Sequence, residues 1–220
     1  MAEHIELDAP KGPMPKAVKP MEVYLPDEND PHRSPFNAPN YLFEVKYDGF
    51  RAIAEIEGGE VNLYLSKPYS YNRRFPLIVD ALRSIGHDVV LDGELVVFDD
   101  EGLPSFKGIQ RYSGGDTTTI GYRVFDILYL DGYDLTKKPL VERKSLMNEY
   151  LSPTLQIWFV THLIGEGIRF FDQVVKGQNL EGMVAKRIDS PYIQDTPLHP
   201  LGLPRPHHWI KIKNPDYQRR

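Results

Sequence analysis

The sequence of 220 residues contains no cysteine. It therefore forms no disulfide and no thiolate metal site, which is consistent with a reducing compartment. The sequence also lacks an uninterrupted apolar run of the roughly 18 residues that a membrane-spanning helix needs. Its N-terminus lacks the apolar core of a signal peptide. We therefore expect a cytoplasmic location and no membrane partner.

An excess of positive charge is missing as well. The chain carries 26 Lys and Arg against 31 Asp and Glu, for a net charge of −5. A protein that holds nucleic acid through its phosphates is usually basic, at least locally. The basic residues gather between Lys186 and Arg220, so any such surface is expected to be a local patch there or to lie elsewhere. A solvated charged tail is the alternative for Arg219 and Arg220.

The chain divides into two parts by composition. Residues 1–38 carry many prolines and few paired apolar positions, which predicts an extended, partly disordered arm. Residues 39–220 predict one domain, and a hydrophobic content of 41% is enough for a core.

The domain reads as a mixture of strands and helices. Apolar residues at helical spacing predict helices, which cover residues 75–85, 142–151 and 167–176. Alternating or mainly apolar runs predict strands, which cover residues 42–48, 51–56, 60–65, 89–98, 122–130, 183–187 and 209–213. Gly58-Gly59 predicts a hairpin turn. The sum is an α+β domain of antiparallel sheets with a few flanking helices.

The most informative stretch runs from Glu44 to Arg51. If the strand continues through Asp48, then Glu44, Lys46 and Asp48 share one face, and Gly49 permits a tight turn or a close ligand approach. A lysine that acts as a nucleophile needs neighbours and partial burial that lower its pKa. Taken alone, the segment is more typical of a half-exposed strand with two salt bridges.

Four further clusters of polar residues within apolar runs follow in a fixed order. They are Leu91-Asp92-Gly93-Glu94, Tyr122-Arg123-Val124-Phe125-Asp126, Glu181-Gly182-Met183-Val184-Ala185-Lys186 and Trp209-Ile210-Lys211-Ile212-Lys213. Together with Lys46-Tyr47-Asp48-Gly49-Phe50-Arg51, they resemble the nucleotidyltransferase motifs of ATP-dependent DNA ligases. The nearest likeness within that family is the ligase module of bacterial end-joining repair proteins.

The resemblance implies a fold and a chemistry. The fold is an ATP-grasp-like nucleotidyltransferase domain. The family often opens with a proline-rich entry segment, which implies that residues 21–25 dock on the domain. In the implied reaction, Lys46 attacks the α-phosphate of ATP and carries AMP, which then moves to the 5′-phosphate of nicked double-stranded DNA. Lys211 and Lys213 alternate with isoleucines, so both amines project from one strand face. The resemblance makes them catalytic residues that hold the α-phosphate.

The resemblance also implies which residues bind the nucleotide. Phe125 would stack on adenine, and Glu44 would accept a hydrogen bond from the adenine amino group. Arg51 would bind near the ribose, and Lys186 would contact phosphate. Val45, Lys67 and Glu94 complete the implied nucleotide-binding residues.

Two acidic residues are the implied metal ligands. Glu94 and Glu181 stand in or beside apolar runs, and a buried carboxylate needs a partner. By resemblance, Glu94 would bind the ribose or a metal ion, and Glu181 would bind a metal ion. Oxygen ligands of this kind suit Mg²⁺ or Mn²⁺. For Asp92, we expect backbone or turn hydrogen bonds rather than a catalytic role.

The sequence departs from the family pattern at one place. After the third strand, ligases usually have Ser-Arg-Asn-Gly, whereas this chain has Ser66-Lys67-Pro68-Tyr69. Lysine keeps the charge but loses the bidentate geometry of arginine. Contacts with the nucleotide or the nicked DNA are therefore expected to be weaker or differently arranged here.

The sequence ends shortly after Lys213, where the family continues into an OB-fold domain. We therefore expect the catalytic domain alone, acting with a separate OB-fold domain or a repair-protein partner. Two other functions stay open. An RNA ligase or an mRNA-capping-type nucleotidyltransferase would share the lysine motif, and an inactive binding module would recruit partners through the proline-rich arm. Preference for ATP over GTP would argue against capping.

Overall fold

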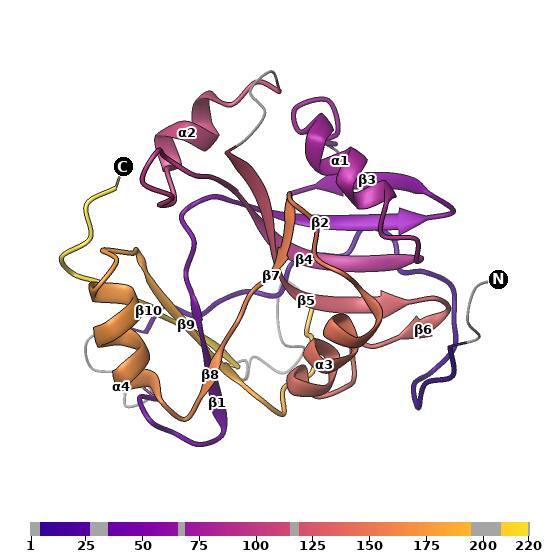
Figure 1. Ribbon diagram of the computed structural model, residues 1–220. Coiled ribbons are helices and arrows are strands. Elements are labelled where there is room, and N and C mark those ends of the chain that lie inside the picture. The colour runs from indigo at the N-terminus through magenta and orange to yellow at the C-terminus, as the bar shows by residue number, and fades with distance from the viewer. Residues whose placement is uncertain (1–4, 27–34, 66–68, 115–118, 195–207, 220) are drawn as a thin grey trace.

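The computed structural model describes residues 5–26, 35–65, 69–114, 119–194 and 208–219, and two sheets dominate it (Figure 1). The strands of the larger sheet are β2 (Phe50–Glu57), β3 (Glu60–Tyr64), β4 (Val89–Val97), β5 (Ile120–Leu130), β6 (Tyr133–Asp134) and β7 (Ile157–Phe159). Their order is β3-β2-β4-β5-β6, and β7 pairs with β5.

The smaller sheet is assembled from segments far apart in the sequence. Its strands are β1 (Tyr41–Val45), β8 (Leu163–Ile164), β9 (Gly182–Arg187) and β10 (Trp209–Lys213). Their order is β10-β9-β1-β8, and every pairing is antiparallel. The central pair, β1 and β9, therefore brings the residues around position 45 beside those around position 183.

Short helices cover the outer faces of the sheets. They are α1 (Pro76–Arg83), α2 (Phe106–Arg111), α3 (Leu140–Tyr150) and α4 (Gly167–Phe170), which continues into a π-helical turn, η1 (Phe171–Lys176). Pro76 begins α1, where its missing N–H costs nothing. Ser105 caps α2 by accepting a hydrogen bond from the Gly108 N–H at 3.1 Å. Among the described residues, no helix is long and apolar enough to cross a bilayer.

Strand alternation separates the apolar core from the polar face. On β4, Leu91 and Leu95 belong to the core that also contains residues of α1 and α3. The intervening Asp92 and Glu94 point to the opposite face, toward the smaller sheet. Behind the smaller sheet, Phe43 and its neighbours pack against α4 and η1. The polar face of the larger sheet therefore meets the smaller sheet.

Most of the long elements agree with the sequence-based predictions. The hairpin turn between β2 and β3 is Gly58-Gly59, with φ angles of +57° and +80° that favour glycine. Two predictions were wrong in detail. The first strand ends at Val45 rather than Asp48, and the sheets are not wholly antiparallel because β7 runs parallel to β5.

The N-terminal arm makes specific contacts where it is described. Met14, Val18 and Met21 are buried against the larger sheet. Tyr24 forms a parallel bridge with Ile210 of β10, so the predicted docking of residues 21–25 is observed. The division into an arm (1–38) and a domain (39–220) stays a prediction. Lys67 lies outside the described residues.

Candidate active site

A cavity of about 500 Å³ opens between the two sheets. Both sheets and the N-terminal arm contribute side chains, because the alternation in each strand turns its polar residues inward. The lining residues are Glu22, Val23, Glu44, Val45, Lys46, Tyr47, Arg51, Glu94, Phe125, Val184, Lys186, Trp209 and Lys211.

Lys46 lies directly after β1, where the chain leaves the sheet. Its backbone N–H donates to the Gly182 carbonyl at 3.0 Å, which fixes the residue beside β9. Its ammonium group forms an ion pair with the Glu181 carboxylate. Gly49 follows, and a Cβ there would lie only 2.2 Å from the Leu95 carbonyl oxygen. The backbone at Gly49 therefore approaches β4 too closely for a side chain.

Glu44 is buried between two lysines. Only 2% of the residue is exposed. Lys144 Nζ lies 2.6 Å from one carboxylate oxygen, and Lys186 Nζ lies 2.5 Å from the other. Burial opposes ionisation of Glu44, but the two ammonium groups outweigh it and hold its pKa below the ordinary value. The carboxylate is therefore a permanent acceptor at neutral pH.

Two aromatic rings, those of Phe125 and Trp209, contact the ammonium group of Lys186. Lys186 Nζ lies 4.1 Å from the ring centroid of Phe125 and 4.0 Å from that of Trp209. The two rings meet edge to face, with centroids 5.9 Å apart. Phe125 therefore reaches the cavity as predicted. Trp209 was not predicted, although its alternation with Lys211 in β10 was a usable signal.

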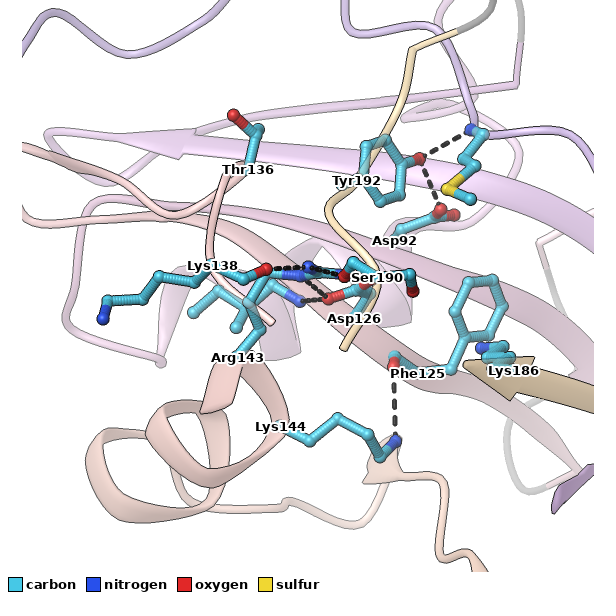
Figure 2. Close-up of polar contacts among 12 residues, drawn as sticks. Asp92, Phe125, Asp126, Thr136, Lys138, Arg143, Lys144, Lys186, Ser190 and Tyr192 are labelled. Atoms are coloured by element: carbon cyan, nitrogen blue, oxygen red, sulfur yellow. Dashed lines mark hydrogen bonds and ion pairs between the residues drawn. The ribbon is translucent and has the colours of Figure 1, made fainter. Parts of the chain in front are cut away.

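Asp92 organises a second buried polar group. Its carboxylate binds the guanidinium of Arg51 through two contacts, of 3.0 and 2.6 Å. It also accepts a hydrogen bond from the Tyr192 hydroxyl at 2.6 Å (Figure 2). Arg51 also donates to the Met21 carbonyl at 2.5 Å. The expectation of backbone or turn bonding for Asp92 was wrong, because its side chain positions Arg51 beside the cavity.

Helix α3 is fixed to β5 by a buried ion pair. Arg143 binds both carboxylate oxygens of Asp126, at 2.8 and 2.7 Å, and neither side chain is exposed (Figure 2). The next residue, Lys144, donates to the Phe125 carbonyl at 3.3 Å and the Val160 carbonyl at 3.1 Å, besides pairing with Glu44. The helix thus delivers the lysine that holds Glu44.

Glu94 and Glu181 both lie close to Lys46. Burial raises the pKa of Glu94 to about 8, although Lys46 and Arg51 oppose that rise. Glu181 lies outside the lining of the large cavity and reaches the site through its ion pair with Lys46. Within the described ranges, no group of three or more His, Asp or Glu side chains is arranged to hold a metal ion.

The structure brings most of the predicted site residues together. Eight of them line the cavity, namely Glu44, Val45, Lys46, Arg51, Glu94, Phe125, Lys186 and Lys211. Burial and the nearby Lys46 lower the pKa of Lys211. Lys213 is exposed and lies outside the cavity lining. Sequence reasoning missed Lys144, whose contact with Glu44 spans 100 residues.

Comparison with known proteins decides the family. Residues 31–213 match the family model described as the ATP dependent DNA ligase domain. The chain belongs to this family. It corresponds to the family's adenylation domain, as expected from the resemblance of its motifs.

Curated relatives support the assignment. The chain is 34% identical over 187 residues to the SPbeta prophage-derived DNA ligase-like protein LigB of Bacillus subtilis, covering 84% of this chain and 65% of that protein. It is 31% identical over 207 residues to the multifunctional non-homologous end joining protein LigD of Pseudomonas aeruginosa, covering 92% of this chain and 23% of that protein. The chain thus spans less than two thirds of either relative.

Solved structures show the same fold. The ligase domain of LigD from M. tuberculosis superposes with a TM-score of 0.72 at 30% identity, covering 89% of this chain and 59% of that one. A mycobacterial DNA ligase D complexed with ATP and MES superposes with a TM-score of 0.69 at 29% identity, covering 89% of this chain and 60% of that one. The fold is therefore the nucleotidyltransferase fold of ligase domains.

Proposed function

We propose that this ligase domain carries AMP on Lys46 and transfers it to the 5′-phosphate of nicked double-stranded DNA. The single observation that supports this best is the position of Lys46, ion-paired with Glu181 at the wall of a cavity of about 500 Å³. A volume of that order suits a nucleotide. The family match and the ATP-bound neighbour support ATP as the nucleotide.

The first step is attack of the Lys46 amine on the α-phosphorus of ATP. A phosphorus–nitrogen bond forms, the bond to the pyrophosphate oxygen breaks, and the amine loses its proton. Glu181 is the carboxylate beside that amine and can accept the proton. Lys211 lines the same cavity and offers positive charge to the phosphoryl oxygens, where charge stabilisation contributes most.

We propose that Phe125, Trp209 and Glu44, which also line the cavity, bind the adenine base. Phe125 and Trp209 present aromatic surface, on which a base stacks favourably. Glu44 is held ionised by Lys144 and Lys186, so it accepts from an amino group and repels a carbonyl oxygen. Adenine carries an amino group where guanine carries a carbonyl, which favours ATP over GTP.

A divalent cation fits the carboxylates near Lys46. Glu94 and Glu181 provide oxygen ligands of the kind that Mg²⁺ or Mn²⁺ prefers. Burial raises the pKa of Glu94 to about 8, and a cation bound beside it would favour its ionised form. These two residues would hold the ion, which would neutralise charge on the phosphates during transfer.

The sealing step requires nicked DNA and a protein surface that holds the duplex. The relatives are longer than this chain, and we propose that an OB-fold domain or a repair-protein partner completes the grip on the duplex. Exposed Lys213 is available to such a surface. We place the reaction in the cytoplasm, at the nucleoid, because ATP and DNA are both present in that compartment.

The decisive experiment incubates the protein with α-labelled ATP and Mg²⁺ and then separates it by denaturing electrophoresis. The wild type should carry covalent label, and Lys46→Ala should carry none. Lys176→Ala removes an exposed lysine that pairs with Asp172, at 3.1 Å, and serves as the control that keeps the label. Adding nicked DNA with a 5′-phosphate should discharge the label. Equal labelling of both variants would refute the assignment of Lys46.

A further inference from the structure

Arg123 is a cation enclosed by aromatic rings. It lies on β5, two residues before Phe125, and its register partner on β4 is Glu94. Its guanidinium carbon lies 4.5 Å from the ring centroid of Phe98, 4.9 Å from that of Trp158 and 5.9 Å from that of Tyr47. These residues come from the end of β4, from β7 and from the loop after β1.

Among the described residues, the guanidinium has aromatic neighbours but no acceptor. Its Nε atom is buried without a hydrogen-bond partner. Within the described part of the chain, no carboxylate or carbonyl oxygen binds Arg123. Burial lowers the pKa of Arg123, as expected for a cation without an anionic partner. Aromatic faces attract the charge, but they do not replace acceptors for the N–H groups.

Other arginines beside aromatic rings are bound differently. Arg74 lies over Phe50 and Phe75, yet it donates to three backbone carbonyls at 2.8 to 3.1 Å. Arg51 and Arg143 have the carboxylates of Asp92 and Asp126. Arg219 lies over Phe106 and binds Asp48 at 2.7 Å. Each of those arginines has a carboxylate or carbonyl acceptor, whereas Arg123 has none among the described residues.

The position of Arg123 connects the active site with the surface. Tyr47 lines the cavity and is the residue next to Lys46. Trp158, on the other side, is 50% exposed. An anion that approaches Lys46 from solvent past Trp158 would therefore meet the Arg123 guanidinium.

We propose that Arg123 is a phosphate-binding residue of the ligase reaction, which holds an anion of a substrate through its free N–H groups. Arginine presents its donors in a planar fork that matches two phosphate oxygens. The phosphate belongs either to the nucleic-acid strand or to the pyrophosphate end of ATP, and both share this chemistry. The inference rests on the proposed ligase function for the identity of these substrates.

The test compares Arg123→Gln with the wild type in two measurements. The first is affinity for a nicked duplex with a 5′-phosphate, by fluorescence anisotropy over a series of salt concentrations. If the strand supplies the phosphate, the dissociation constant should rise about tenfold or more. The slope of log affinity against log salt should also fall in magnitude by about 0.9, the contribution of one phosphate.

The second measurement is the rate of covalent labelling by ATP and of its reversal by inorganic pyrophosphate. If the nucleotide supplies the phosphate, the KM for ATP should rise about tenfold and pyrophosphate-driven release of AMP should slow, with the salt slope unchanged. Arg83→Gln removes one exposed cation that pairs with Asp80, at 2.7 Å, and is the charge-matched control. Identical behaviour of Arg123→Gln and Arg83→Gln in both measurements would overturn the proposal.

If Arg123→Gln does not fold, a measurement on the wild-type protein still tests the proposal. The Nε–H resonance of Arg123, assigned with Arg123→Lys, is followed by NMR as inorganic pyrophosphate or a 5′-phosphorylated oligonucleotide is added. A saturable shift supports the proposal, and its absence up to millimolar concentrations would refute it. Failure of the wild type to take up label would instead refute the proposed function, so the two failures are distinguishable.

Discussion

Lys46 and Glu181 form an ion pair although 135 positions separate them in the sequence. Antiparallel pairing of β1 with β9 places Val45 opposite Met183, so the residues just beyond these positions meet at one end of the strand pair. The proposed nucleophile and its carboxylate are therefore positioned by backbone register. Four predictions follow from this arrangement and from the contacts around it.

We expect Glu181→Gln to slow covalent labelling by about 10- to 100-fold. Removing a residue that supports a metal ion or a reacting group commonly has an effect of that size. Glutamine keeps the shape of the side chain but can neither accept the Lys46 proton nor neutralise a cation. The initial rate of labelling by ATP measures the effect. Glu60→Gln, at an exposed position of β3, should leave the rate unchanged, and equal rates in the two variants would exclude a role for Glu181.

Removal of divalent metal should stop the labelling reaction. Phosphoryl transfer depends on neutralising the phosphate charge, and Glu94 and Glu181 are the carboxylates available near Lys46. EDTA should abolish the label, and excess Mg²⁺ or Mn²⁺ should restore it. Full activity in EDTA would eliminate the metal role.

Phe125→Leu should raise the KM for ATP by about 5- to 150-fold, because stacking of a base on an aromatic ring contributes roughly 1–3 kcal/mol. Phe171→Leu changes an aromatic ring that packs against Phe36, away from the cavity, and should leave the KM unchanged. GTP should label the wild type far more slowly than ATP does. Labelling by GTP at the same rate would revive the capping alternative.

Arg143→Met should lower the free energy of unfolding by about 3–5 kcal/mol, because it leaves the buried Asp126 carboxylate without its partner. Urea denaturation measures the loss. Lys176→Met breaks an exposed pair with Asp172 and should cost less than about 1 kcal/mol. Similar losses in the two variants would show that the buried pair does not anchor α3.

Local patterns in the sequence were sufficient for the long elements and for most of the site. Apolar runs interrupted by polar residues predicted β4 and β5, and helical spacing predicted α1. Helix α3 was also predicted. The short strands β6, β7 and β8 were missed because two or three residues show no periodicity. Helix α2 has six residues and was missed for the same reason.

Pairings between distant segments could not be predicted from the sequence. Lys144 and Tyr192 each lie 100 residues from the carboxylate that they contact. In the sequence, Lys144 is one charged residue in a helix full of them, and nothing marks it as buried. Asp92 likewise looked like a turn residue. Strand β2 places Arg51 opposite Glu94, from where its side chain reaches the Asp92 carboxylate diagonally. Register between strands decides these contacts, and single-sequence patterns do not encode it.

Glu22 and Val23 line the cavity, so they affect where a truncated fragment of this protein should begin. The match to the ligase family begins at residue 31, so a fragment designed on that boundary would lose both residues. It would also lose the Met21 carbonyl that accepts from Arg51 and the main chain of Tyr24 that pairs with β10. Such a fragment would expose Trp209 to water and open one wall of the nucleotide site. Weak activity in a trimmed protein would then report the missing wall, not the chemistry of Lys46.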